Sequence, residues 1–574
     1  MFRNQPFGLY VLSLANTGER FGYYTMLAIF LLFLQAKFGF DSAVSGQIYA
    51  GFLAAVYFMP LIGGWLADKW NFNKCVITGI MVMFAGYLIM AIPTGIRSTG
   101  SLVILLGALV LIAIGTGLFK GNLQVMVGDL YNESRYAKQR DAAFSLFYMA
   151  INIGSMFAPM TATAMTNLSM KAHGFVYNAD LPALCNKLLD AEAAGGNTSA
   201  LANKVLETAS AANMHATDAI SFSSDYITAL STGYSYGFAV ACASLVISFL
   251  IYWIGRRSYA HILTDKKAAA TATVKTAVKH KELTPAQTKS RIIALLLVFA
   301  VVIFFWMVFH QNGATLTEFA KSCTAPELGG WTRIGFNVWG LASIAVGVYA
   351  LFSLFQSKTA KGRIISALIL AAVAGIVWYI YSSTPDPVSN LQPQQYQQFN
   401  PFYVVALTPV SLALFGWLAK RKKEPSAPRK IGYGMLMAAI DYAVMLIGSF
   451  QLAGSTQGAV SPNWLIGTYL LLTFAELLLS PMGISFVSKV APPKYKGSMM
   501  GGWFAATAIG NYLVSIPMLL WGKIDIWVLW LILIGICLIS GVFIFSIMKK
   551  LEAATSNDDA QPADSLETVE VDAI

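Results

Sequence analysis

Charged residues are scarce in this sequence, and their scarcity limits the kind of protein it encodes. Only 12% of the 574 residues are Asp, Glu, Lys or Arg, whereas 56% are hydrophobic. A soluble protein would carry about 25% charged residues. Many of the apolar runs exceed the ~18 residues that a helix needs to cross a bilayer. The composition therefore excludes an ordinary soluble protein and predicts a polytopic helical membrane protein.

Cysteine is also scarce, and its five copies show neither the spacing of a metal site nor that of a redox motif. We expect no metal and no other cofactor. Cys75, Cys242 and Cys537 fall in or near apolar segments and are expected to be packing residues. Cys185 and Cys323 fall in two predicted outside loops, where a disulfide could form in an oxidising compartment.

The net charge of +11 does not indicate nucleic-acid binding, because the basic residues gather in loops on one predicted side of the membrane. Lys and Arg are enriched in cytoplasmic loops, so we place these loops and both termini in the cytoplasm. The first apolar run is too long for a cleavable signal peptide and contains Glu19 and Arg20. We expect it to remain as a membrane helix.

Apolar segments of helical length predict an all-α membrane protein with fourteen spans. They cover residues 9–34, 44–67, 73–93, 101–127, 141–167, 232–255, 291–313, 335–356, 362–383, 400–420, 431–454, 463–487, 498–520 and 524–548. A basic stretch divides them near the middle, as a linker between two bundles would. The predicted division is an N-terminal six-helix bundle (1–167 and 232–255), an extracytoplasmic insertion with a helix near 198–213 (168–231), a cytoplasmic linker (256–290), a C-terminal six-helix bundle (291–313 and 400–548), an extra helix hairpin on the outside (335–383) and a disordered acidic cytoplasmic tail (549–574).

The first apolar segment carries a carboxylate and a guanidinium at membrane depth. Charges there cost several kcal/mol, so they usually face a bundle interior and serve function. One helical face collects Asn16, Glu19, Arg20, Tyr23, Tyr24 and Leu27. The alternative is a structural Glu–Arg pair that joins two helices. Because adjacent side chains diverge by about 100° around a helix, we expect Glu19 and Arg20 to contact different partners.

Further polar residues fall within later apolar segments. Lys120 either faces inward, where it could pair with Glu19, or extends to the membrane surface as an anchor. Asn152 could recognise a peptide-like ligand or join two helices. Asp441 lies in the middle of its segment, and Glu476 lies at membrane depth before a proline that would kink the helix.

Together these residues resemble the proton-coupled oligopeptide transporter family, a branch of the major facilitator superfamily. The resemblance rests on motifs in both halves of the chain, in the family's order: Glu19-Arg20-Phe21 with Tyr23-Tyr24, Gly63-Gly64 with Ala67-Asp68, Lys120, Phe147-Tyr148 with Ile151-Asn152-Ile153-Gly154, Asn400-Pro401, and Ala475-Glu476 with Ser480-Pro481. It implies a non-enzymatic symporter that imports di- and tripeptides with protons by alternating access.

The resemblance also implies roles for individual residues. Glu19, Arg20 and Lys120 would form the proton-coupling cluster, with the two cations facing the peptide carboxylate and Glu476 receiving the peptide amino terminus. The remaining pocket residues would be Tyr23, Tyr24, Tyr57, Asn152, Asn400 and Trp503. Gly64 and Asp68 would belong to a gating joint near the cytoplasm. A cationic half-site facing an anionic one selects a zwitterionic peptide.

The sequence departs from the family pattern at three positions. Asn16 stands where the family usually has a second Glu, so one proton-binding carboxylate is missing. Leu27 and His310 replace an Arg and its usual acidic partner, so both ends of a gate salt bridge are changed together. His310 could take a proton at physiological pH, or it could be a neutral hydrogen-bonded histidine. Asp441 could compensate for the missing carboxylate or bond a neighbouring helix.

Three other functions are alternatives to peptide–proton symport. A symporter for nitrate or another small anion would leave Glu476 with nothing to bind. A membrane-embedded enzyme would need paired catalytic acids or a nucleophile–base spacing that this sequence does not offer at membrane depth. A non-transporting peptide sensor would bind without translocation. We expect a monomer in a bacterial inner membrane, with small peptides and protons as its partners.

Overall fold

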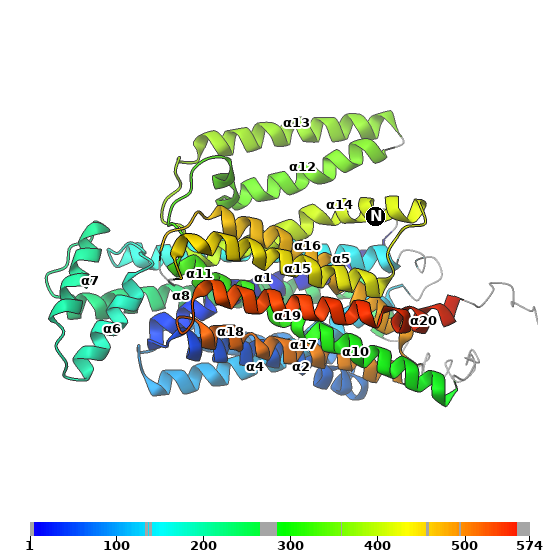
Figure 1. Cartoon of the computed structure of the whole chain (residues 1–574), viewed down its shortest axis with the longest axis horizontal. Helices are drawn as coiled ribbons and strands as arrows, with labels where there is room; N and C mark the ends of the chain where they lie inside the picture. Colours follow the sequence, from blue (N-terminus) through cyan, green and yellow to red (C-terminus); the bar gives the residue numbers. More distant parts are fainter. Residues whose placement is uncertain are drawn as a thin grey trace, which may run out of the picture.

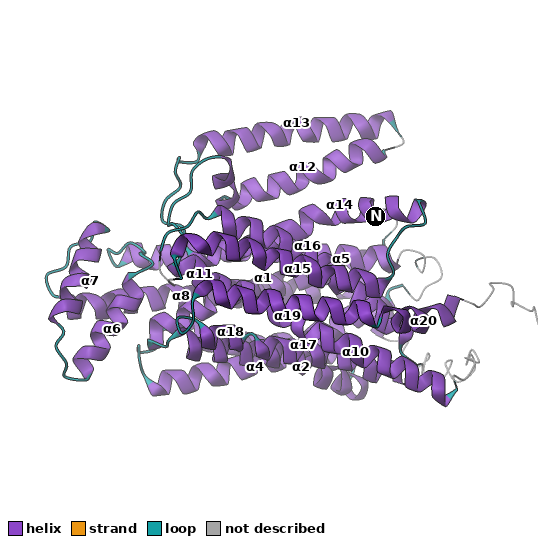
Figure 2. Ribbon diagram, viewed as in Figure 1, coloured by secondary structure: helices purple, strands orange, loops and turns teal. Residues whose placement is uncertain are grey.

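The structure is a computed structural model that describes residues 5–131, 136, 140–263, 284–357, 359–454, 458–492 and 495–559. Most of the predicted linker (264–283) and of the predicted acidic tail (560–574) lies outside the described residues. The described part is almost wholly helical and contains isolated β-bridges rather than strands (Figure 2).

Thirteen helices of the described part are long and apolar enough to cross a membrane. They are α1 (Phe7–Phe38), α2 (Ser42–Trp70), α3 (Phe72–Ala91), α4 (Thr99–Asp129), α8 (Ala219–Ile254), α10 (Pro285–Phe309), α12 (Val338–Gln356), α13 (Ala360–Ser383), α14 (Phe399–Lys420), α15 (Ala427–Ser449), α16 (Asn463–Val490), α17 (Lys496–Leu513) with α18 (Ser515–Leu520), and α19 (Ile526–Ser546). The 33-residue helix α5 (Arg140–Ala172) is also of spanning length but is not among the thirteen. With α5, these helices account for the fourteen predicted segments, and the predicted all-α membrane fold is confirmed.

The buried hydrophobic residues form two main clusters that divide the bundle. One cluster comes almost entirely from α1–α8 and the other almost entirely from α10–α20. We call these two parts the N-half and the C-half. In Figure 1 the chain's N-terminus and α20 (Met548–Asp559) lie at one end of the bundle, and α6 (Leu181–Ala193) and α7 (Ser199–Ala211) project from the other. We call these ends the termini end and the insertion end.

The segment predicted as one long insertion contains more helix than expected. It holds both α6 and α7, while α5 continues to Ala172 and α8 begins at Ala219 rather than at residue 232. The sequence places the start of this helix too far along the chain, because residues 219–231 include several polar side chains. One face of this stretch is nevertheless fully buried, through Tyr226, Ile227 and Leu230.

All five cysteines are buried, and Cys185 and Cys323 form no disulfide with each other. Burial raises the pKa of the Cys185 thiol to about 11. A buried thiol of this kind is held protonated and is poorly reactive.

The helix hairpin α12–α13 lies at the edge of the bundle (Figure 1). Side chains of α12 join the hydrophobic cluster of the C-half, whereas α13 leaves Leu368, Trp378 and Tyr379 more than half exposed. Large exposed apolar side chains of this kind suit contact with lipid in a spanning helix. The hairpin is therefore peripheral to the central bundle.

Candidate functional site

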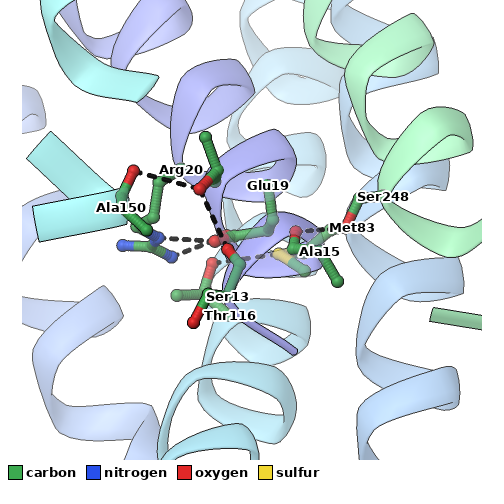
Figure 3. Close-up of polar contacts among 9 residues, drawn as sticks. Ser13, Ala15, Glu19, Arg20, Met83, Thr116, Ala150 and Ser248 are labelled. Carbon is green, nitrogen blue, oxygen red and sulfur yellow. Dashed lines mark hydrogen bonds and ion pairs between the residues drawn. The ribbon is translucent and has the colours of Figure 1, made fainter. Parts of the chain in front are cut away.

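Helix α1 carries Glu19 and Arg20 and is packed closely by its neighbours. A Cβ added at Gly154 of α5 would lie 2.7 Å from the Thr17 carbonyl oxygen, so only glycine permits this approach. The Thr17 hydroxyl donates to the Ala150 carbonyl at 3.0 Å, and the Ser248 hydroxyl of α8 donates to the Ala15 carbonyl at 2.5 Å. These contacts fix the polar face of α1 inside the N-half (Figure 3).

Glu19 and Arg20 pair with each other, contrary to the expectation that they contact different partners. Arg20 Nε donates to Glu19 Oε2 at 2.5 Å, and Nη2 donates to Oε1 at 2.6 Å (Figure 3). Glu19 is 0% exposed and Arg20 is 3% exposed. The long Arg20 side chain curves around the helix to reach Glu19, because an unpaired buried charge would cost far more free energy than this bent conformation.

Lys120 of α4 does not pair with Glu19. Its ammonium Nζ lies 4.2 Å from the ring centroid of Tyr57, and among the described residues it forms no ion pair. It faces inward toward the central cavity and is therefore not a surface anchor. Since Arg20 is neutralised by Glu19, Lys120 is the cation of the site whose charge no described carboxylate balances.

A central cavity of about 240 Å³ lies between the N-half and the C-half. It is lined by all nine residues expected to bind substrate and by His310: Arg20, Tyr23, Tyr24, Tyr57, Lys120, Asn152, His310, Asn400, Glu476 and Trp503. The Trp503 ring packs against Gly483, where an added Cβ would lie 1.9 Å from the ring. The structure thus brings together, in one space, side chains from positions far apart in the sequence.

Glu476 provides the negative side of the cavity. Its Oε1 accepts a hydrogen bond from the Tyr148 hydroxyl at 3.1 Å, and its Oε2 accepts one from Asn400 Nδ2 at 3.0 Å. Both donors are neutral, and the carboxylate forms no ion pair within the described part of the chain. Basic residues on α1 and α4 and an acidic residue on α16 therefore line the same cavity.

Asn152 was expected either to contact a ligand or to join two helices. Its amide nitrogen donates to the Tyr148 carbonyl at 3.0 Å, one turn earlier in α5. This bond stays within one helix and joins no neighbour. Because Asn152 also lines the cavity, the geometry favours contact with a ligand.

His310 follows α10 in a short 3₁₀ segment, η3 (His310–Gly313). Its ring stacks on Trp306 at 5.2 Å and meets the Tyr57 ring edge at 5.8 Å. Its Nδ1 lies 3.2 Å from the Trp306 carbonyl oxygen. The histidine is therefore hydrogen-bonded to the backbone of its own segment and packed between aromatic rings.

Asp441 is not brought to the cavity. It is 0% exposed in α15, and neither carboxylate oxygen has a hydrogen-bond partner among the described residues. It therefore makes no side-chain bond to a neighbouring helix in this structure. A buried carboxylate without partners is expected to be uncharged, because desolvating its charged form is costly.

Gly63, the neighbour of the expected gating residue Gly64, makes the close packing contact of α2. The glycine that lets α2 approach α4 is Gly63, where an added Cβ would lie 2.2 Å from the Gly117 carbonyl oxygen. Gly64 has open space on its Cβ side and plays no part in this approach. The side chain of Asp68 lies outside the described residues.

Several cavity residues were not identified as site residues from the sequence. They include Tyr49, Gln124, Tyr148, Asn312 and Gln397. Tyr148 could have been identified from the sequence, since it stands one helical turn before Asn152 on the same face. Gln397 carries no such signal, because its approach to the cavity depends on how the chain enters α14.

The chain matches the model of the POT family over residues 73–282 and 368–526. It is 25% identical to dipeptide and tripeptide permease A of Yersinia pestis, covering 88% of this chain and 82% of the relative. It is 25% identical to the di-/tripeptide transporter of Lactococcus lactis subsp. lactis, covering 88% and 87%. A solved peptide transporter POT in complex with sulfate superposes with a TM-score of 0.65 at 22% identity, over 97% of each chain. The family model covers more than half of the sequence, and the chain belongs to the POT family.

Proposed function

We propose that this protein imports di- and tripeptides together with protons, by alternating access between its N-half and C-half. The observation that carries the proposal is the bipolar cavity, in which Arg20 and Lys120 face Glu476. A short peptide has a carboxylate at one end and an ammonium at the other, so this charge arrangement selects it. The names of the bacterial relatives as peptide permeases and transporters support the same substrate class.

The buried pair on α1 supports the proposed proton coupling. A proton on Glu19 would remove the charge that holds the Arg20 guanidinium. Arg20 would then be an unpaired buried cation, at a cost of several kcal/mol, unless a substrate carboxylate replaced Glu19. Proton binding and peptide binding therefore favour each other. His310 is a second group in the cavity able to accept a proton, whereas Asp441 lies outside the cavity and has no part in this step.

The proposed setting is a bacterial inner membrane, with the protein as a monomer and both termini in the cytoplasm. The enrichment of Lys and Arg in loops on one predicted side of the membrane supports this orientation. The two halves would move against each other and expose the cavity to each side in turn. Gly64 and Asp68 are proposed to act at the joint near the cytoplasm.

Uptake of labelled dialanine into proteoliposomes tests the proposal. We expect accumulation above equilibrium only with an inward proton gradient. Glu19→Gln, assayed per folded transporter, should abolish accumulation and spare peptide exchange. Equilibration that ignores the gradient would refute the coupling, and dialanine binding without uptake would indicate a sensor. Uptake of labelled nitrate, without uptake of dialanine, would assign the cavity to a small anion.

A further inference from the structure

A glutamine-rich segment leads into α14 at the insertion end. Five of the seven residues from 392 to 398 are glutamine, and most of them form the 3₁₀ turn η5 (Pro393–Gln398). These side chains are largely buried, so their amides need partners. Their partners show what the segment does.

Three of these amides donate to oxygen atoms of the N-half. Gln392 Nε2 donates to Asn167 Oδ1 at 2.6 Å, and Gln394 Nε2 donates to Thr163 Oγ1 at 3.1 Å, both in α5. Gln397 Nε2 donates to the Ala28 carbonyl of α1 at 3.3 Å. We call these three bonds the amide clasp.

A second contact on α1 lies beside the clasp. Gln35 Nε2 donates to Glu318 Oε2 at 2.7 Å, and Lys321 Nζ donates to Gln35 Oε1 at 2.7 Å. Glu318 and Lys321 belong to α11 (Thr315–Ser322) of the C-half. Ala28 and Gln35 are two helical turns apart on one face of α1. The C-half therefore holds a single face of α1 at two points toward the insertion end.

Gln397 differs from the other clasp residues because it also lines the central cavity. It lies one turn before Asn400, which bonds Glu476. Its amide nitrogen donates two hydrogen bonds, one to the Ala28 carbonyl and one to Thr317 Oγ1 at 3.1 Å. Its amide oxygen accepts no hydrogen bond from the part of the chain that the structure describes.

We propose that Gln397 ties occupancy of the cavity to closure of the insertion end. Its free amide oxygen accepts a hydrogen bond from an N–H group of the bound ligand, while its amide nitrogen holds α1 to the C-half. A ligand that fixes this side chain stabilises the clasp, so the insertion end closes over an occupied cavity. The inference rests on the proposed function, since it takes the ligand to be a small peptide. Gln397 is a positioning residue in this scheme.

Cross-linking across the clasp tests the inference. Asn167→Cys and Gln392→Cys place a thiol on each half where the native side chains touch, and a short bifunctional thiosulfonate joins them when the insertion end is closed. Dialanine should raise the cross-linking rate of this pair about fivefold, the change expected from one additional hydrogen bond. Adding Gln397→Ala should remove this response.

Two neighbouring glutamines serve as controls. Gln398 donates to the Gly335 carbonyl within the C-half at 2.8 Å, so Gln398→Ala should keep the response to dialanine. Gln394→Ala should lower the cross-linking rate measured without dialanine, and dialanine should still raise that rate. A response in Gln397→Ala equal to that in Gln398→Ala overturns the inference alone. No response in the parent pair, together with no dialanine binding to the wild type, overturns the proposed function and the inference with it.

Discussion

Loss of the Glu19 charge should destabilise the protein strongly, and more than loss of Arg20. Glu19→Gln leaves the Arg20 guanidinium 3% exposed and without its carboxylate. Breaking a buried pair in this way costs about 3–5 kcal/mol, and arginine cannot escape the cost by losing its proton. In Arg20→Met the lone Glu19 can become neutral by taking a proton. We therefore expect a clearly smaller loss for Arg20→Met.

Equilibrium unfolding in mixed detergent micelles measures these differences. The matched control is Asp190→Asn, which removes one partner of an ion pair with Arg97 at the protein surface, where Asp190 is 60% exposed. Exposed pairs contribute about 0–1 kcal/mol, so this variant should unfold almost like the wild type. The double variant Glu19→Gln with Arg20→Met should recover most of the loss. A Glu19→Gln protein as stable as the control would refute the reasoning.

Three further outcomes follow from the structure. Gly63→Ala should lower the free energy of unfolding by about 1–3 kcal/mol, because its Cβ meets a backbone carbonyl, whereas Gly64→Ala should be tolerated; thermal unfolding compares the two. Glu476→Gln should weaken dialanine binding about 10- to 100-fold by calorimetry, since the anionic side of the cavity is lost; unchanged affinity would contradict this. The Ser426 hydroxyl and the Arg429 guanidinium hold the pKa of Glu552 below its usual value. This contact therefore stabilises α20 above about pH 4 and is lost as the pH falls further. Hydrogen exchange in α20 should rise only below that pH.

The sequence was sufficient to predict most of the cavity. Charged and amide side chains inside apolar segments are costly in a membrane, so each one marks a surface that faces the bundle interior. That argument located Arg20, Lys120 and Glu476, and the cavity brings them together. The helix count could be predicted for the same reason, because spanning length and apolar composition are local properties of the chain.

The partners of these residues could not be predicted in the same way. Position on a helical face sets where a Cα–Cβ bond points, whereas a long side chain can bend back, as Arg20 does toward Glu19. Asp441 had the same sequence signal as Glu476, yet it is buried away from the cavity, because burial within one half and burial between halves give the same pattern. Gln397 had no signal, since its role depends on contacts between segments distant in sequence.

The contacts of α5 have a consequence for how the protein is made. Helix α5 belongs to the N-half, yet two of its polar side chains bond to residues far along the chain, Tyr148 to Glu476 and Asn167 to Gln392. Both partners belong to the C-half and are synthesised long after α5. The N-half therefore completes its polar contacts only after most of the C-half has emerged from the ribosome.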